Sequence, residues 1–294
     1  MLLIYYKAQR GLHMANRNNV NDVAAYNNGI DTAALVNSCK HFVLDMDGTF
    51  YLGNHIFPFS LDFLKTLQNT GRDFIFFTNN SSKSSEAYIK KLADMNCHIT
   101  KNQIMTSGDV TIAYINATHS GKRVYLLGTD ALIKSFLEAG IQLVQDEPDV
   151  VVVGFDTGLT YEKICKASDF VRNGAVYLAT HLDINCPVEN GFITDVGAFC
   201  AMISLSAGGK KVKALGKPNP ETVDMAMQQN GWKKREEVAF VGDRLYTDVA
   251  AGVNNGARGL LVLTGEASME DVRTSNIKPD AVFKDLAEIG SCLQ

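Results

Sequence analysis

The chain has 294 residues, of which 46% are hydrophobic and 20% charged, and its formal net charge is −4. This length suits one large domain or two of moderate size, each with an apolar core. The acidic balance gives no basic footprint for nucleic acid, and no apolar run reaches the roughly 20 residues that span a bilayer. We therefore expect a globular protein with no nucleic-acid or membrane partner.

The six cysteines are scattered and include no CxxC pair. This spacing favours reduced thiols in a cytoplasmic protein over a zinc site or a disulfide framework. Residues 1–38 form an N-terminal extension of weak periodicity, and Met14 is a candidate for the true start.

From His41 onward, apolar runs alternate with amphipathic stretches, which is the pattern of repeated βα units. Buried strands of a parallel sheet read as continuous apolar runs. Strands are expected at residues 42–44, 74–77, 104–106, 124–127, 150–153, 175–178, 238–241, 259–263 and 281–283. Helices are expected at 61–67, 88–95, around 136–137, at 161–171 and 202–205, from 220 and from about 245. The sequence therefore predicts an α/β fold.

A pair of carboxylates follows the first expected strand. Asp45 and Asp47 come directly after residues 42–44, and Gly48 is next. Loops at the carboxyl ends of parallel strands form the crevice in which open α/β sheets bind ligands. Two carboxylates buried there together need a cation or a shared proton, and a glycine lets the backbone approach an anion. The pair indicates a metal and a phosphate, with simple turn carboxylates as the alternative.

Hydroxyl and amide side chains follow the second strand, in Thr78–Ser82. They can donate to phosphate oxygens without adding charge. They are also favoured helix caps, and a helix start is itself an anion site, so both interpretations stay open.

A lysine lies in the proline-rich run 215–220. Pro218 and Pro220 fix this loop and begin the next helix, which holds Lys217 near the sheet edge. An ordinary surface lysine is the alternative.

Two further carboxylates, Asp243 and Asp248, follow the apolar run 238–241. Asp248 also suits a helix start, where the dipole favours an anion. With the earlier clusters they complete a set: two carboxylates for nucleophilic and acid/base work, two more for a cation, and a lysine with hydroxyl donors for an anion. Magnesium prefers oxygen ligands, and phosphoryl transfer needs little beyond placement and charge stabilisation.

These segments resemble motifs I to IV of the haloacid dehalogenase (HAD) superfamily, over roughly residues 40–290. Its phosphatases carry DxDGT, a strand-end Thr or Ser, a lysine and GDxxxxD. Within the superfamily the chain is similar to subfamily IIA, the para-nitrophenylphosphatase-like group that includes pyridoxal phosphatases and bacterial nucleotide or sugar phosphatases. The matching segments are Asp45–Thr49 (DMDGT), Thr78–Ser82 (TNNSS), Gly216–Pro220 (GKPNP) and Gly242–Asp248 (GDRLYTD).

The resemblance implies a covalent mechanism. Asp45 would attack phosphorus to form an aspartyl-phosphate. Asp47 would protonate the leaving oxygen and then deprotonate the water that hydrolyses the intermediate.

The resemblance also implies a Mg²⁺ ion. The Asp45 carboxylate, the Asp47 backbone carbonyl and Asp243 would hold it, with Asp248 acting in support through a water or on Lys217.

The phosphate group would be held by a second set of residues under the same resemblance. These are the Gly48 backbone, Thr78, Asn79 and Lys217.

The fold that the resemblance implies is a Rossmann-like parallel-sheet core at residues 39–112 and 209–294. An inserted α/β cap of the C2 type, at 113–208, would cover the site and choose the substrate. Caps in this family often meet at a dimer interface, so the resemblance offers a homodimer through the cap as one arrangement and leaves the oligomeric state open.

Three cap residues are candidates for substrate contact: His181, Asp183 and Asp195. Residues 179–183 read ATHLD, where the family commonly has ATNxD or ATDxD, and 191–197 depart from the usual P-G-x-G with Thr194 and Asp195. An extra carboxylate near the leaving group would disfavour nucleotides. Structural loop residues are the alternative.

The predicted function is a Mg-dependent phosphomonoester hydrolase acting on a small phosphorylated metabolite, with sugar or polyol phosphates favoured over nucleotides or pyridoxal phosphate. A phosphotransferase or phosphomutase on the same scaffold is one alternative. A non-catalytic phospho-accepting regulatory domain is another, although it needs neither Asp47 nor a cap. Haloacid dehalogenation is disfavoured, since Asp47 and the metal carboxylates would be superfluous.

Overall fold

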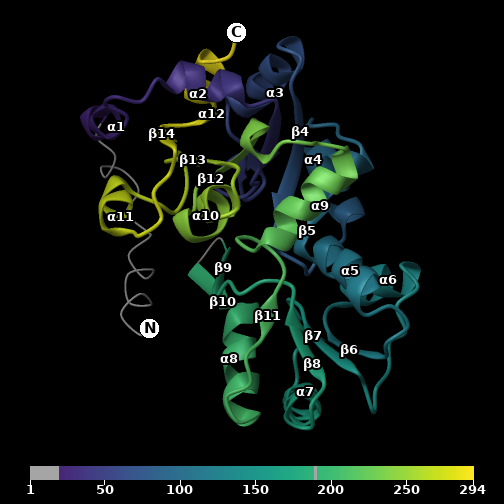
Figure 1. Cartoon of the computed structure of the whole chain (residues 1–294). Coiled ribbons are helices and arrows are strands. Elements are labelled where there is room, and N and C mark those ends of the chain that lie inside the picture. Colours follow the sequence, from purple (N-terminus) through teal and green to yellow (C-terminus); the bar gives the residue numbers. More distant parts are fainter. Residues whose placement is uncertain (1–19, 189–190) are drawn as a thin grey trace. The chain divides into compact units, whose positions relative to one another are not determined.

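A computed structural model describes residues 20–188 and 191–294 (Figure 1). Met14 and the rest of residues 1–19 lie outside this description. The chain forms two compact units that differ in their bounds from the predicted core and cap, and that predicted division stays a prediction. Unit 1 comprises Met1–Leu52, Ile56–Phe74 and Lys234–Gln294, and unit 2 comprises Gly53–His55 and Ile75–Lys233.

The larger sheet has six strands. Its pairs β1–β12, β12–β13, β13–β14 and β4–β5 are parallel. At the start of β4 the N–H of Asp73 donates to the carbonyl of Lys40, just before β1, at 3.2 Å. The strand order is β14 (Ala281–Phe283), β13 (Arg258–Val262), β12 (Val238–Gly242), β1 (His41–Leu44), β4 (Asp73–Thr78) and β5 (Ile104–Thr106).

The middle strands of unit 1 are buried almost throughout. Residues 42–44 of β1 and every residue of β12 are shielded from solvent. Strands covered on both faces need apolar side chains at successive positions, which explains the continuous runs in the sequence. The register pairs Leu44 with Val241, so the two strands end at the same level. The predicted strands 42–44 and 238–241 are confirmed.

The helices of unit 1 include the predicted helix at 61–67, which is part of α3. The helix expected from about Leu245 begins there as a π-helical turn, η4, and continues as the short helix α10. The described helices and helical turns are α1 (Val20–Tyr26), α2 (Thr32–Ser38), α3 (Ser60–Asn69), η3 (Arg235–Glu237), η4 (Leu245–Val249), α10 (Ala250–Val253), α11 (Met269–Thr274) and α12 (Leu286–Ser291).

The described part of the N-terminal extension is folded into unit 1. The side-chain amide of Asn27 donates to the carbonyl of Val282 in β14 at 2.7 Å and accepts its N–H at 3.1 Å. Tyr26 donates its hydroxyl to the carbonyl of Pro279 at 2.8 Å. Asn27 thus satisfies backbone groups on β14, the last strand of the sheet, which would otherwise need water.

Unit 2 contains a second parallel sheet, of four strands, against which α7 and α8 pack (Figure 1). Ala167 and Val171 of α7 and Ile203 of α8 share one buried cluster with Val151, Val153 and other strand residues. The strand order is β11 (Lys213–Ala214), β8 (Val176–Ala179), β7 (Val150–Val153) and β6 (Val124–Leu127). This second α/β series confirms the predicted strands 124–127 and 150–153.

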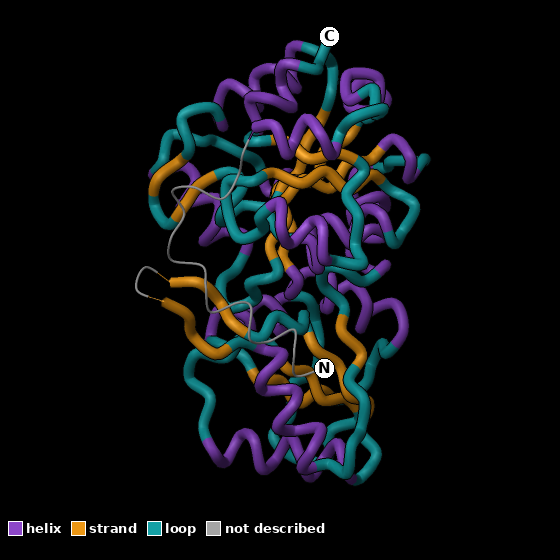
Figure 2. The backbone as a smooth tube through the Cα atoms, turned by 90° about the vertical axis from the view of Figure 1, so that its left-hand side faces the viewer, coloured by secondary structure: helices purple, strands orange, loops and turns teal. Residues whose placement is uncertain are grey.

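An antiparallel hairpin that the sequence did not predict follows β8. Its strands, β9 (Asn185–Val188) and β10 (Gly191–Thr194), are the orange pair beside the short grey trace in Figure 2. The other elements are β2 (Tyr51–Leu52), β3 (His55–Ile56), α4 (Ser85–Asp94), η2 (Lys101–Gln103), α5 (Ser107–Thr118), α6 (Asp130–Glu138), α7 (Tyr161–Arg172), α8 (Val196–Ser206) and α9 (Pro220–Asn230).

No helix among residues 20–188 and 191–294 combines the length and the apolar character that crossing a bilayer requires.

Candidate active site

The carboxyl ends of β1 and β12 bring three carboxylates together in unit 1. Asp45 follows β1, and its N–H donates to the carbonyl of Val241 at 2.9 Å. Asp243 follows β12, and Asp248 lies in η4. One carboxylate oxygen from each of the three lies within 4.8 Å of the other two. The structure thus gathers three of the four carboxylates in the predicted set.

Asp243 is held from two sides. Its Oδ2 atom accepts the N–H of Glu266 at 2.7 Å, and its Oδ1 atom accepts the hydroxyl of Thr49 at 3.2 Å. Burial raises the pKa of Asp243 to about 6; the Asp248 carboxylate also raises it, and Arg244 lowers it. The protein therefore stabilises the charged form of Asp243 less well than water does.

The π-helical turn η4 places Asp248 against the end of β12. Its Oδ2 atom accepts the N–H of Arg244 at 3.1 Å. A Cβ atom on Gly242 would lie 2.2 Å from the Cβ atom of Asp248, so only glycine fits at that strand end. Single π turns occur often at functional sites, and here the turn brings a carboxylate back toward the sheet edge.

Asp47 differs from the other three carboxylates because its side chain is exposed. It lies in the turn between β1 and β2, where it forms a parallel bridge with Tyr51. The next residue, Gly48, has φ of +89° and donates its N–H to the carbonyl of Tyr51 at 2.8 Å. A Cβ atom at Gly48 would lie 2.6 Å from Oδ2 of Asp243. Gly48 therefore makes room for Asp243.

A loop that the sequence analysis missed completes the carboxylate site. It follows β13 and comprises Thr264, Gly265 and Glu266. The Thr264 hydroxyl donates to the carbonyl of Gly48 at 2.6 Å, and a Cβ atom on Gly265 would lie 2.0 Å from Oδ2 of Asp243. The signal was present, since Thr-Gly-Glu is another polar cluster directly after an apolar strand.

The carboxylate site fits a hard divalent cation. Asp243 and Asp248 are 3% and 2% exposed, and three carboxylates packed within 4.8 Å repel one another without a counter-charge. Oxygen donors of this kind suit Mg²⁺. The residues present are therefore the right set for such an ion.

In unit 2, Lys217 and Asn79, two of the four predicted phosphate-binding residues, contact each other. Lys217 is 3% exposed, and its ammonium donates to the carbonyl of Phe77 at 3.3 Å. The amide of Asn79 accepts the N–H of Lys217 at 2.9 Å and donates to its carbonyl at 3.1 Å. The hydroxyl of Thr78 accepts the N–H of Asn80 at 3.1 Å. Lys217 is thus a buried cation on a fixed loop, which excludes an ordinary surface lysine.

The three cap candidates also lie together in unit 2. His181, Asp183 and Asp195 are buried, and ligand atoms from the three lie within 4.8 Å of one another. The His181 ring contacts Asp195 through Nε2 and Thr180 through Nδ1, both at 3.0 Å. Asp195 also caps α8 by accepting the N–H of Val196 at 2.7 Å. Since both ring nitrogens have hydrogen-bonding partners, this cluster is a hydrogen-bond network, and substrate contact by His181 or Asp195 stays a prediction.

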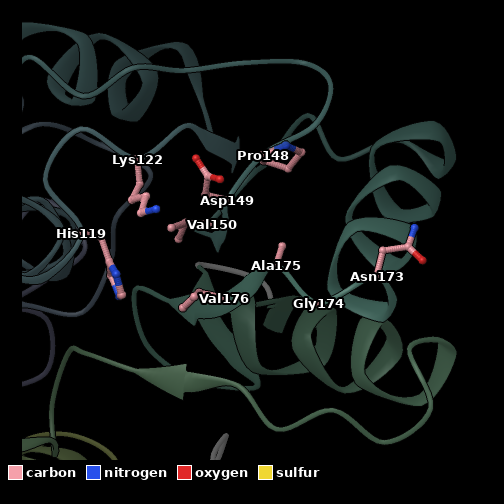
Figure 3. Close-up of a pocket in the computed structure, with 9 residues that line it drawn as sticks. All are labelled: His119, Lys122, Pro148, Asp149, Val150, Asn173, Gly174, Ala175 and Val176. Carbon is pink, nitrogen blue, oxygen red and sulfur yellow. The ribbon is translucent and has the colours of Figure 1, made fainter.

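A pocket of about 340 Å³ lies elsewhere on unit 2 (Figure 3). Its lining includes Val150 and Val176, the first residues of β7 and β8, with His119 and Lys122 on the segment before β6. Thr180 and His181 follow the opposite, carboxyl end of β8. In parallel sheets ligands bind at the carboxyl ends, so this pocket is not a candidate for the predicted chemistry.

Two family models match the chain. One, described as haloacid dehalogenase-like hydrolase, covers residues 42–142, and the other, described as HAD-hydrolase-like, covers residues 214–289. Together they include the carboxylate site and the loop of Lys217.

Named relatives agree with these models. A protein named acid sugar phosphatase from Staphylococcus aureus strain MRSA252 is 37% identical over 250 residues, which is 85% of this chain and 96% of the relative. The crystal structure of a 4-nitrophenylphosphatase from Thermotoga maritima has a TM-score of 0.85 and 43% identity, covering 88% of this chain and 99% of that one. NagD from Escherichia coli K-12 has a TM-score of 0.79 and 30% identity, covering 85% and 98%. The chain therefore belongs to the haloacid dehalogenase-like hydrolases, among the subfamily IIA proteins that its motifs resemble.

Proposed function

We propose that the protein is a Mg²⁺-dependent phosphomonoester hydrolase acting on a small phosphorylated metabolite. The observation that carries this proposal is the cluster of Asp45, Asp243 and Asp248, three carboxylates within 4.8 Å at the end of a buried parallel sheet. The family and the phosphatase names of the relatives support the same reaction class.

Mg²⁺ would be held by the carboxylates of Asp45 and Asp243 and by the backbone carbonyl of Asp47, with Asp248 in support. When bound, the ion supplies positive charge next to the phosphate oxygens. Thr264 and Glu266 keep Gly48 and Asp243 in place through the hydrogen bonds described above. These contacts support the role of Asp243 as a ligand, because they fix its carboxylate without any substrate present.

Asp45 is the proposed nucleophile. Its carboxylate oxygen forms a bond to phosphorus while the bond from phosphorus to the leaving oxygen breaks, giving an aspartyl-phosphate. Asp47 donates a proton to the leaving oxygen and later takes one from the water that attacks the intermediate. The exposure of Asp47 suits this role, because a proton carrier must reach both substrate and solvent.

Phosphate binding is assigned to Thr78 and Lys217, as the sequence motifs predict. Asn79 is part of the same assignment, but its side chain is engaged by the Lys217 backbone. Gly48 contributes chiefly by lacking a side chain, since its N–H donates to Tyr51. The four motifs follow one another along the chain in the order that the family has. We therefore propose that these residues and the carboxylates act on one phosphate group.

A sugar or polyol phosphate is the favoured substrate class. The relative named acid sugar phosphatase supports this preference. Asp195 gives it little support, because its carboxylate is 3% exposed and lies 3.0 Å from Nε2 of His181.

We also propose a reducing, cytoplasmic setting. The six cysteines lie in the described part of the chain, and none forms a disulfide there.

Phosphate release from para-nitrophenyl phosphate tests the proposal. It is measured with and without Mg²⁺ for the natural protein, Asp45→Asn and the control Asp62→Asn, an exposed carboxylate on α3 paired with Lys65. We expect Mg²⁺-dependent release by the natural protein and the control, and a loss of at least about a thousandfold in Asp45→Asn. Equal rates in all three proteins would rule out the mechanism. Transfer to an added alcohol in place of release would favour a phosphotransferase.

A further inference from the structure

The side chain of Asn79 is paired with the backbone of Lys217 at two points. Oδ1 accepts the Lys217 N–H at 2.9 Å, and Nδ2 donates to the Lys217 carbonyl at 3.1 Å. Asn79 is 6% exposed. A side-chain amide that pairs with both backbone groups of one residue acts like a neighbouring strand and fixes that peptide in place. The lysine is thus oriented by its backbone as well as by its ammonium.

The ammonium of Lys217 is held at the other end of the side chain. It donates to the carbonyl of Phe77 at 3.3 Å and lies 5.1 Å from the centroid of the Phe77 ring. With its backbone fixed by Asn79 and its tip at the end of β4, the side chain of Lys217 has little rotational freedom. A cation held in this way loses little entropy when it binds an anion.

Asp183 favours the orientation in which the Asn79 amide pairs with Lys217. Both of its carboxylate oxygens lie 3.4 Å from Nδ2 of Asn79. An amide nitrogen has two hydrogens, and these find acceptors in the Lys217 carbonyl and the Asp183 carboxylate. A carboxylate repels the amide oxygen, so Asp183 keeps Oδ1 turned toward the Lys217 N–H.

Hydrogen bonds to the start of α8 hold the backbone around Asp183. The Asp183 carbonyl accepts the N–H of Gly197 at 2.8 Å, and Asp195 donates its N–H to the Ile184 carbonyl at 2.9 Å. A Cβ atom on Gly197 would lie 2.3 Å from the Leu182 carbonyl oxygen. The start of α8 therefore lies tightly against the segment that carries Asp183.

A row of buried, hydrogen-bonded side chains adds to these backbone contacts. The Ser81 hydroxyl lies 3.0 Å from that of Thr180, which lies 3.0 Å from Nδ1 of His181, and Nε2 of His181 lies 3.0 Å from Asp195. The order hydroxyl, imidazole, carboxylate matches a nucleophile triad. However, Ser81, Thr180 and His181 are all 0% exposed, so no substrate reaches either hydroxyl. The row connects the segments after β4 and β8 to α8.

We propose that Asn79 and Asp183 are positioning residues for Lys217, and that the His181–Asp195 contact holds Asp183 in place for this purpose. Neither Asn79 nor Asp183 needs to touch the substrate. This inference rests on the proposed function of Lys217 in phosphate binding. It assigns a purpose to the cap candidates that differs from direct substrate contact, because Asp183 acts on the substrate only through Asn79 and Lys217.

The test is a double-mutant cycle of Asn79→Ala and Asp183→Ala. We measure KM and kcat for para-nitrophenyl phosphate, and the dissociation constant of inorganic phosphate by calorimetry. Losing the two-point contact in Asn79→Ala is expected to weaken phosphate binding and raise KM about tenfold, and Asp183→Ala about threefold. The double variant is expected to equal Asn79→Ala alone, since Asp183 acts through Asn79. Effects that multiply would mean that Asp183 contacts the substrate directly and would overturn the proposal, as would unchanged binding in Asn79→Ala.

Two further variants separate positioning from folding. Asp183→Asn keeps an acceptor for Nδ2 of Asn79 and should hold KM within about twofold of the natural protein. Tyr177→Phe removes a buried hydrogen bond of 3.1 Å between β8 and the Cys200 carbonyl of α8, so it should lower the Tm and leave phosphate binding unchanged. If Tyr177→Phe weakened phosphate binding as much as Asp183→Ala, the effect would be general loosening and the proposal would be wrong.

The outcomes also separate this inference from the proposed function. If the natural protein releases no phosphate from any ester, the proposed function fails. The calorimetric comparison of phosphate binding still decides whether Asn79 and Asp183 position Lys217. If Asn79→Ala does not fold, the two Asp183 variants, which keep the Asn79 side chain itself, decide the question by the same phosphate-binding constants.

Discussion

The backbone N–H of Glu266 holds the Oδ2 atom of Asp243 at 2.7 Å. The carbonyl of Asp243 accepts the next N–H, that of Ala267, at 3.0 Å. Asp243 therefore lies against the loop after β13 along both its side chain and its backbone. This loop shapes the proposed metal site without supplying a side-chain ligand to it.

Gly265→Ala should damage metal binding. The new Cβ atom would lie 2.0 Å from Oδ2 of Asp243, so the carboxylate or the loop must move. We expect the Mg²⁺ concentration that gives half-maximal activity to rise at least about tenfold. The Mg²⁺ dissociation constant measured by calorimetry should rise by the same factor. Gly290→Ala is the control, because its Cβ atom would make an ordinary 3.4 Å contact with Phe63. Equal Mg²⁺ affinity in both variants would contradict the role of the loop.

Thr264→Val should misplace the turn that carries Gly48. The Thr264 hydroxyl donates to the Gly48 carbonyl at 2.6 Å, and valine leaves that acceptor without its donor. We expect kcat/KM to fall about tenfold in Thr264→Val and to stay within about twofold in Thr264→Ser, which keeps the hydroxyl. If serine behaved like valine, the hydrogen bond would not be the cause.

The stability of the metal-free protein should fall as the pH rises, because of Asp243. Burial raises the pKa of this carboxyl in the folded state to about 6 from an ordinary value of 3.8. The stability that such a group contributes is fully present below the unfolded pKa and is lost as the pH rises through the folded pKa. The metal-free protein should therefore lose stability from this group between about pH 4 and pH 7.

Asp243→Asn isolates that contribution. At neutral pH without metal, we expect the variant to have a higher Tm than the natural protein, because it buries no charge there. Added Mg²⁺ should raise the Tm of the natural protein only. Thermal melting with EDTA and with Mg²⁺ measures both effects. A lower Tm for metal-free Asp243→Asn would show that the carboxylate stabilises the fold by itself.

The N-terminal segment should contribute to stability and not to chemistry. Asn27→Ala removes both hydrogen bonds to Val282 and leaves backbone groups of β14 without these partners. We expect a loss of about 1–3 kcal/mol in the free energy of unfolding, with kcat and KM unchanged. Asn28→Ala, at an exposed neighbouring position, is the matched control for urea unfolding. A change in kcat would connect this segment to the active site.

The core strands and the carboxylate cluster could be predicted from the sequence. Residues 42–44 and 150–153 are buried on both faces, and a strand in that position needs continuous apolar residues. Asp45 and Asp243 follow paired strands that end at the same level, so the position of each in the sequence determined its position in the sheet. Burial and strand direction decide these features, and both leave a pattern in the sequence.

Other features depend on tertiary contacts that leave no periodic signal. Helices α1 and α2 have seven residues each, too short to be stable alone, and the segment is held by contacts such as that of Asn27 with β14. Glu266 contacts Asp243 through its backbone N–H, which every residue except proline carries. An aspartate at position 195 suits contact with a substrate and contact with His181 equally well, so the sequence does not distinguish the two. The fold determines these relationships.

Trapping the phosphorylated protein tests the central claim most directly. The natural protein and Asp45→Asn are mixed with para-nitrophenyl phosphate and Mg²⁺ and quenched in acid, and their peptides are analysed by mass spectrometry. We expect one phosphoryl group on Asp45 in the natural protein and none in Asp45→Asn, whose turnover is also lost. Phosphate release by the natural protein with the phosphoryl group on another residue, or unchanged turnover in Asp45→Asn, would contradict the proposed mechanism.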